Sequence, residues 1–274
     1  MRRLRLGMMA GGISLDPDAV AFLTAAGITD ATITTAIDTL VTDLKGYGIW
    51  NKIFAIYPFV GGTATTHKFN LKNPADTNAA FRLSFVGGWT HSANGAKPNG
   101  TNAYADTFLN CFNNLTTGNT HISYYSTTNS LTTNNFCDVG ASNDYNISLN
   151  SFQLALQRNL SGTPSVFDSV RFSLSRVSAT VSTSDGFYIG SNENTSSRKL
   201  YKNGILLGQN LNFDNNSQPT HTVYIGAVNN NGTPGFYTDR NSALLSIGTA
   251  LTTTEAANFY TAVQAFQTTL GRQV

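Results

Sequence analysis

The sequence RKLYKNGILLGQNL, residues 198–211, predicts two β-strands joined by a tight turn. Asn203 and Gly204 form the turn, because both tolerate the positive φ angles that a two-residue connection requires. Apolar and aromatic residues flank the pair on both sides, as in strands. This segment therefore predicts an antiparallel β-hairpin.

The same texture extends from about residue 48 to residue 248. Short alternating or aromatic-rich runs are separated by Gly, Asn, Ser and Pro; they include residues 52–60, 67–71, 81–85, 121–127, 152–160 and 222–227. No helical pattern lies between them. Many strands at short intervals favour an antiparallel sandwich or jelly roll over a parallel sheet.

Helical patterns stand at both ends of this strand-rich body. Asp16 is suited to cap a helix that starts at Pro17, and Gly27 is suited to end it. A second helix is predicted from about Asp30 to residue 46, with one apolar face. The result is an N-terminal helical hairpin.

A last helix is predicted near the end of the chain, where Thr252 and Glu255 form a capping-box pattern before an apolar face. The predicted class is thus mainly β, with a helical hairpin before the sandwich and a helix after it. We divide the chain into residues 1–15 as an arm, 16–47 as the helical hairpin, and 48–274 as the jelly roll with its C-terminal helix.

The amino-acid composition favours a folded domain with one large core and no membrane-spanning segment. The chain has 274 residues, of which 41% are hydrophobic, 11% aromatic and only 12% charged. That aromatic content argues against disorder, and the length is enough for one large core. No run approaches the roughly 20 apolar residues of a membrane span.

The net charge of +2 depends on the first residues of the chain. Arg2, Arg3 and Arg5 supply three of the 17 basic residues, which leaves 14 basic against 15 acidic residues elsewhere. The remaining chain has no cluster of Lys and Arg, so we expect no nucleic-acid partner. Cys111 and Cys137 could pair only if the fold brings them together, and the composition favours two buried free thiols.

Residues 1–13 begin like a secretory signal, but Gly7, Gly11 and Gly12 interrupt the apolar part. We expect instead an arm that docks on a neighbouring subunit or partner. Its arginines would pair with acidic groups and its apolar residues would fill a groove; the docking residues are Arg2, Arg3, Leu4, Arg5, Leu6, Met8 and Met9. The alternative is an arm folded back on its own domain.

The pattern of acids and histidines argues against an enzyme. Glycoside hydrolysis needs paired carboxylates, and the two glutamates, Glu193 and Glu255, stand in different predicted elements. The four histidines are scattered without the spacing of a zinc site, so we expect no cofactor. A structural Ca²⁺ stays open as a minor alternative; the candidate aspartates are Asp138, Asp144 and Asp239.

Binding residues are predicted in the polar, Gly-rich stretch 87–102, which we expect to be a long loop. An exposed Trp89 with His91 and Asn94 nearby suits stacking on a sugar ring and hydrogen bonding to its hydroxyls. Tyr104 is a further glycan-binding candidate. The alternative for Trp89 is a packing role at the sandwich edge.

Several segments resemble the concanavalin A-like, laminin-G-like jelly roll. Residues 98–106 (PNGTNAYAD) are similar to the strand that opens many such domains, and residues 199–207 (KLYKNGILL) to their NG hairpin. The closing order of YIGA at 224–227, SIG at 246–248 and a final amphipathic helix also matches. This resemblance covers about residues 50–270 and implies a sandwich fold.

A narrower resemblance, to virion proteins of bacteriophages, lies in the first hundred residues. It rests on KGYGIW at 45–50, IYPFVGG at 56–62 and GGWTH at 87–91. It implies a non-enzymatic structural protein on the exterior of a virion: a capsid- or tail-attached spike, decoration or host-adhesion module. Its partners would be other virion proteins through the arm, further copies in a homo-oligomer, and a host surface glycan.

The alternative function is a secreted or cell-surface carbohydrate-binding module that could also cleave glycans. It predicts an affinity for a defined sugar.

Overall fold

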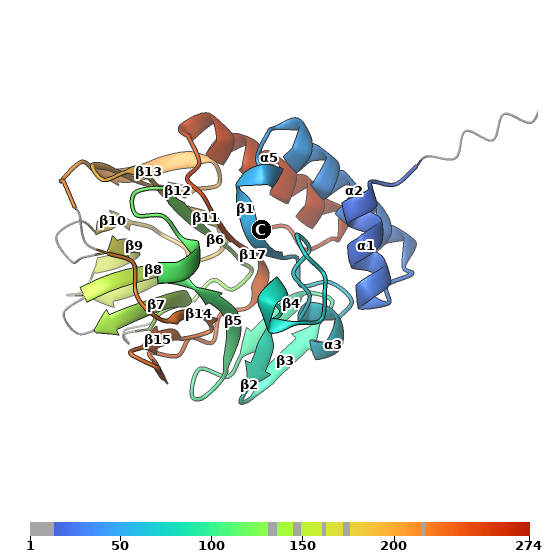
Figure 1. Ribbon diagram of the computed structural model, residues 1–274, viewed down its shortest axis with the longest axis horizontal. Helices are drawn as coiled ribbons and strands as arrows, with labels where there is room; N and C mark the ends of the chain where they lie inside the picture. Colours follow the sequence, from blue (N-terminus) through green and yellow to red (C-terminus); the bar gives the residue numbers. More distant parts are fainter. Residues whose placement is uncertain (1–13, 131–135, 145–148, 161–162, 172–175, 215–216) are drawn as a thin grey trace, which may run out of the picture.

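The computed structural model of the protein describes residues 14–130, 136–144, 149–160, 163–171, 176–214 and 217–274. Two sheets pack face to face, and helices cover the outer face of the first sheet (Figure 1). The predicted class, a mainly β antiparallel sandwich with an N-terminal helical hairpin and a C-terminal helix, is confirmed.

The first sheet is antiparallel throughout. Its strands, in spatial order, are β13 (Ile205–Asn210), β12 (Ser197–Lys202), β11 (Gly186–Asn194), β6 (Thr120–Ser126), β17 (Ser242–Gly248), β4 (Gly95–Pro98) and β3 (Trp89–Ser92). A further strand, β1 (Ile53–Tyr57), pairs with β17 so that Ile53 lies opposite Gly248. The centre of this sheet therefore joins strands from the two ends of the chain.

The second sheet carries the surface described below as a candidate site. Its strands, in spatial order, are β10 (Val177–Thr180), β9 (Thr163–Arg171), β8 (Leu149–Leu160), β7 (Val139–Asp144), β14 (Thr222–Ile225), β5 (Tyr104–Asn110) and β2 (Ser84–Val86). Strand β15 (Val228–Asn230) pairs in parallel with β7 and forms a hairpin with β16 (Thr233–Gly235).

The long helices are α1 (Pro17–Ala26), α2 (Ala31–Gly46) and α5 (Thr253–Thr269). Shorter helical turns are η1 (Trp50–Lys52), α3 (Ala64–His67), η2 (Asn78–Ala80) and α4 (Cys111–Asn114). The predicted ends are confirmed: Asp16 caps α1, Gly27 ends it at φ 66°, and Thr252 and Glu255 form a complete capping box on α5. No helix in the described ranges combines the length and apolar character of a membrane span.

Two hydrophobic clusters hold the layers together. One lies between the helices and the first sheet, and includes Phe22, Leu40, Phe187 and Phe259. The other fills the space between the sheets; its members include Tyr57, Phe152, Leu154, Tyr188 and Leu245. Burial of this apolar surface is the main stabilising contribution, at about 25 cal/mol per Å².

The predicted hairpin over residues 198–211 is confirmed. Strands β12 and β13 flank the turn, where Asn203 has φ 50° and Gly204 has φ 74°. Two positive φ angles in succession match the type I′ turn that suits the twist of paired strands.

Several segments differ from their prediction. Short helices, α3, η2 and α4, lie within the body that was predicted to have none, and the strand predicted at residues 81–85 begins only at Ser84. Residues 67–71 were expected to form a strand, but α3 ends at His67, and the buried Asn70 amide accepts a hydrogen bond from the Ile56 nitrogen at 2.9 Å. That side chain takes the place of a strand partner beside β1. Residues 87–102 were expected to form a long loop, but they fold as the β3–β4 hairpin, with Ala96 opposite Ser242.

Ionised side chains are also buried in the fold. Asp138 and Arg240 are fully buried with Nη1 and Oδ1 3.3 Å apart, and Asp138 also accepts from Thr238 Oγ1 at 2.9 Å and the Leu156 nitrogen at 2.6 Å. This removes Asp138 from the candidates for a calcium ligand. Both cysteines are buried free thiols, as the composition favoured; they are Cys111 and Cys137.

Arg272 anchors the end of the chain, and within the described ranges no carboxylate contacts it. Its guanidinium donates five hydrogen bonds of 2.6–3.0 Å to oxygens only; the acceptors are the Gln267 amide and the carbonyls of Pro58, Phe59, Ala93 and Ala243. Burial lowers the pKa of Arg272 to about 9, so the group is still charged at neutral pH. These bonds tie the segment after α5 to the residues that follow β1, to the β3–β4 turn and to β17.

Candidate functional site

Trp89 lies on β3 at the edge of the sandwich. Its Nε1 donates to the carbonyls of Val86 and Tyr104, both at 3.1 Å, and its ring lies edge-on to Phe85 at 5.2 Å. The side chain is half-buried and packs against the cluster between the sheets. Since the indole N–H is occupied, the geometry favours the packing role that the sequence left as an alternative.

His91 follows on the same strand and contacts a second histidine. His91 Nδ1 lies 2.9 Å from Nδ1 of His67, which is 1% exposed. Burial lowers the pKa of His67 to about 3 and also lowers the pKa of His91. Both rings are therefore neutral at pH 7, with one Nδ1–H donating to the other ring.

Asn94 lies on the turn between β3 and β4, at the far end of β3 from Trp89. Its side chain is exposed, and its carbonyl accepts from Asn241 Nδ2 at 2.7 Å. Three of the four predicted glycan-binding residues thus share one hairpin. The rings of Trp89 and His91 stack with centroids 6.1 Å apart, whereas Asn94 lies away from them on the turn. Their role in glycan binding stays a prediction.

The fourth, Tyr104, lies on the outer face of the second sheet among other aromatic rings. It stacks on Tyr224 of β14 with ring centroids 4.5 Å apart and an interplanar angle of 25°. Tyr237, between β16 and β17, is half-exposed and donates its hydroxyl to the Pro234 carbonyl at 3.1 Å. We call Tyr104, Asp106, Tyr224 and Tyr237 the tyrosine face.

The alternation of β5 positions this surface. Tyr104, Asp106 and Phe108 point outward and are half-buried, whereas the residues between them are buried between the sheets. Pairing then sets Asp106 opposite Tyr224 on one side and Ser84 on the other. Period-two alternation thus delivers one carboxylate into a group of tyrosines.

The hydroxyls of Tyr224 and Tyr237 are neutral at physiological pH. Burial and the nearby Asp106 raise the pKa of Tyr224 to about 12, and burial raises the pKa of Tyr237. Burial also raises the pKa of Asp106, whose carboxylate accepts from the Phe108 nitrogen at 2.8 Å. Flat rings beside hydroxyl donors and a carboxylate acceptor suit a polyhydroxylated ligand.

A contact that resembles a catalytic dyad lies elsewhere. His121 Nε2 is 2.9 Å from Ser246 Oγ, and His121 Nδ1 is 2.5 Å from the Thr249 carbonyl. Burial lowers the pKa of His121 to about 4, and both His121 and Ser246 have 0% exposure. The contact therefore joins β6 to β17 and is closed to any substrate.

The other predicted sites differ in what the structure describes of them. The docking residues of the arm, Arg2, Arg3, Leu4, Arg5, Leu6, Met8 and Met9, lie outside the described residues. Across the described ranges, no group of three or more His, Cys, Asp and Glu side chains has the arrangement of a metal site.

Sequence reasoning singled out Tyr104 but missed Asp106 and Tyr224 as its neighbours. The alternation in residues 103–110 was a usable signal for Asp106. Tyr224 is 120 positions away, and its contact depends on the pairing of β5 with β14.

Comparison with known proteins adds information on the fold alone. No family model matches the chain, and no curated protein matches it either. Among solved structures, the chain resembles domain 4 of AbnA, a GH43 extracellular arabinanase from Geobacillus stearothermophilus, in complex with arabinotriose. The TM-score is 0.53 and the identity 15%, over 76% of this chain and 98% of that one.

A second similar structure is the CBM40 of the Ruminococcus gnavus IT-sialidase, bound to α2,3 sialyllactose. The TM-score is 0.37 and the identity 14%, over 51% of this chain and 80% of that one. The first likeness agrees with the two-sheet sandwich described above. Nothing in these comparisons supports the phage virion role that the sequence resemblance implied.

Proposed function

We propose that this chain is a carbohydrate-binding β-sandwich module, which was the alternative function drawn from the sequence. The observation that carries the proposal is the tyrosine face, where stacked and half-exposed rings flank the carboxylate of Asp106. Aromatic faces pack against the C–H faces of sugars while hydroxyls and carboxylates bond to sugar hydroxyls. The arabinotriose complex of the similar arabinanase domain supports the same choice of ligand class.

We propose further that the module binds glycans without cleaving them. Each glutamate has a structural partner: Glu193 lies 2.6 Å from Lys199 Nζ, and Glu255 lies 2.6 Å from Lys52 Nζ within the cap of α5. Ion-paired glutamates on different elements lack the facing arrangement that glycoside hydrolysis needs.

The test is a glycan-array screen followed by titration calorimetry with arabinotriose and the best-binding oligosaccharide. We expect Tyr104→Ala and Tyr237→Ala each to weaken binding about two- to tenfold, the range for one aromatic contact. Tyr47→Ala is the matched control, because Tyr47 is 37% exposed on the helical hairpin and should leave the affinity unchanged. Absence of millimolar binding to any glycan, or equal affinities for all four proteins, would contradict the proposal.

The virion role is a second proposal, supported by the resemblance in the first hundred residues. It places the chain on the exterior of a phage particle, as a spike, decoration or host-adhesion module. Mass spectrometry of purified particles tests it. A fixed ratio to the main shell protein is expected, and absence from particles would exclude it.

A further inference from the structure

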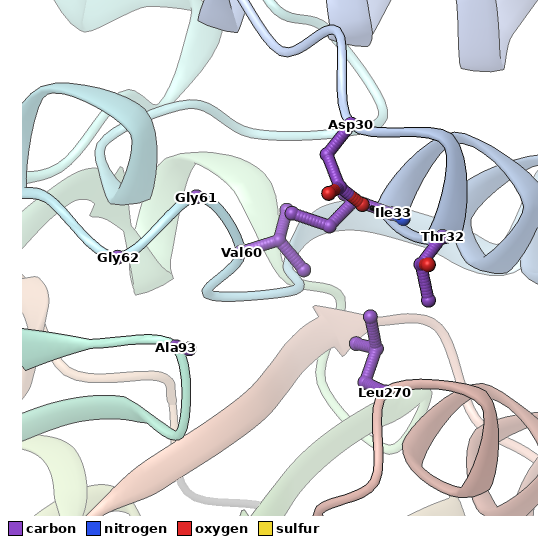
Figure 2. Close-up of a pocket in the computed structure, with 8 residues that line it drawn as sticks. All are labelled: Asp30, Thr32, Ile33, Val60, Gly61, Gly62, Ala93 and Leu270. Carbon is purple, nitrogen blue, oxygen red and sulfur yellow. Dashed lines mark hydrogen bonds between the residues drawn. The ribbon is translucent and has the colours of Figure 1, made fainter.

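Apolar hollows lie on both sides of residues 28–34, where α2 begins. One, of about 360 Å³, has Leu15 and Ile28 in its wall. The other, of about 330 Å³, has Ile33 of α2 and Leu270 after α5 in its wall (Figure 2). Both volumes lie near the lower end of the range of about 300–1,000 Å³ for ligand pockets, which suits side chains of an extended segment.

The helical hairpin around these hollows is strongly acidic. Residues 16–46 contain five aspartates and one lysine, a net charge of −4. Lys45 Nζ lies 2.7 Å from Asp16 and 2.6 Å from Asp18. The other three aspartates, which have no ion-pair partner within the described ranges, are Asp30, Asp38 and Asp43.

Asp30 links the two features. Its carboxylate caps α2 by accepting from the Ile33 nitrogen at 2.8 Å, and the same side chain lines the second hollow with Val60 (Figure 2). A segment that filled this hollow would therefore place a neighbouring residue beside a negative charge. The favoured occupant combines apolar side chains with cations in alternation.

Residues 1–13 have this composition. Their sequence, MRRLRLGMMAGGI, interleaves three arginines with Leu4 and Leu6 and continues with Met8 and Met9. The three positive charges are opposite in sign to the net charge of −4 on residues 16–46. Asp30 lines a hollow, whereas Asp38 Oδ1 already accepts from the Asp16 nitrogen at 2.6 Å. Arginine–carboxylate pairs are strong charge-assisted hydrogen bonds when both geometry and charge match.

The attachment point of the arm favours docking within one chain. Leu15, two residues after the arm, is itself part of the wall of the first hollow. Thirteen residues span at most about 43–47 Å, and Gly11 and Gly12 allow the chain to reverse. A short tether also gives an effective concentration in the millimolar range, far above that of a second copy in dilute solution.

We propose that residues 1–13 dock on the helical hairpin of their own chain, with leucine and methionine side chains in the two hollows and the arginines on the acidic surface of the hairpin, one of them beside Asp30. The arm then belongs to the folded domain, which was the alternative left open by the sequence. This proposal does not depend on glycan binding.

Disulfide capture in the full-length chain tests the docking. Met9→Cys is combined with Thr34→Cys, since Thr34 lines the first hollow. The matched control combines Met9→Cys with Thr101→Cys, an exposed position on the turn before β5. The native thiols, Cys111 and Cys137, are buried and should not interfere.

We expect the Met9–Thr34 cysteine pair to form an intramolecular disulfide at least tenfold faster than the control pair at micromolar protein. Replacing the three arginines by alanine, or raising salt to about 1 M, should slow capture severalfold, because the Debye length falls to about 3 Å. Equal rates for the two pairs would overturn the proposal. If only disulfide-linked dimers formed, docking in cis would be overturned and a second copy would be the receptor. If the capture rate did not respond to salt or to loss of the arginines, the role of the aspartates would be overturned.

Discussion

Replacing Arg272 by methionine should remove several kcal/mol of stability, although no acidic side chain of the described residues contacts it. Methionine keeps much of the aliphatic volume but donates no hydrogen bond. The carbonyls of Pro58, Phe59 and Ala93 would lose the guanidinium donor, while the Ala243 carbonyl keeps Gln267 Nε2 at 3.4 Å; each acceptor left unpaired costs about 1–3 kcal/mol. Release of the buried charge offsets part of that sum, which leaves an expected loss of about 3–4 kcal/mol.

Urea unfolding followed by circular dichroism measures this loss as a fall in midpoint at constant slope. For a chain of this size it corresponds to a drop of about 6–16 °C in Tm. Arg272→Lys should fall between wild type and Arg272→Met, because an ammonium has three donors for five acceptors.

Arg82→Met is the matched control. Arg82 is half-exposed, donates to Asn78 Oδ1 at 3.1 Å and lies 3.6 Å from Asp76, so its loss should cost less than about 1 kcal/mol. If Arg272→Met were as stable as Arg82→Met, the reasoning that these carbonyls depend on the guanidinium would be refuted.

Three further perturbations test other parts of the fold. The folded-state pKa values of His121, about 4, and His67, about 3, lie below the ordinary 6.5, so the contribution of each ring is complete above pH 6.5 and is lost as pH falls. Each ring accounts for about 2 kcal/mol between pH 7.5 and pH 5, so urea midpoints should report about 4 kcal/mol less stability at pH 5 than at pH 7.5. A flat profile over that interval would contradict the neutral, buried imidazoles. Asp138→Ala leaves Arg240 buried without its carboxylate partner and should lower the free energy of unfolding by about 3–5 kcal/mol in the same assay. A loss below about 1 kcal/mol would contradict this and would show that water replaces the carboxylate. Gly248→Ala would drive a Cβ into the Lys52 carbonyl oxygen, and we expect about 3 kcal/mol of destabilisation by thermal unfolding; an unchanged Tm would mean that β1 shifts freely.

Local signals predicted the parts of the fold that depend on a few adjacent residues. The caps at Asp16 and Thr252 and the turn at Asn203 and Gly204 act through bonds and φ angles within one turn, so their chemistry is legible in the sequence. Residues 87–102 were misassigned because they lack alternation. Their two strands pair with each other, and the hairpin joins the first sheet through Ala96 opposite Ser242, 146 positions away (242 − 96).

In the candidate site, too, the features set by adjacent residues were predictable and the contacts between distant strands were not. Tyr104 and the alternation that exposes Asp106 are local, and the sequence carries both. Tyr224 joins them only because β14 pairs with β5, and that pairing depends on the packing of the whole sandwich. For Trp89 the sequence offered both an exposed sugar-binding ring and a packing role at the sandwich edge, and its hydrogen bond to the Tyr104 carbonyl favours packing.

The pairing of β1 with β17 determines how long β1 lacks its partner strand while the chain is being synthesised. Ile53 precedes its partner Gly248 by 195 positions (248 − 53), and ribosomes add about 5–20 residues per second. The apolar strand Ile53–Tyr57 therefore waits roughly 10–40 s for β17 to be made. Throughout that interval the nascent chain presents an unpaired edge to its surroundings, and this is the stage at which a chaperone would act on it and at which aggregation competes with folding.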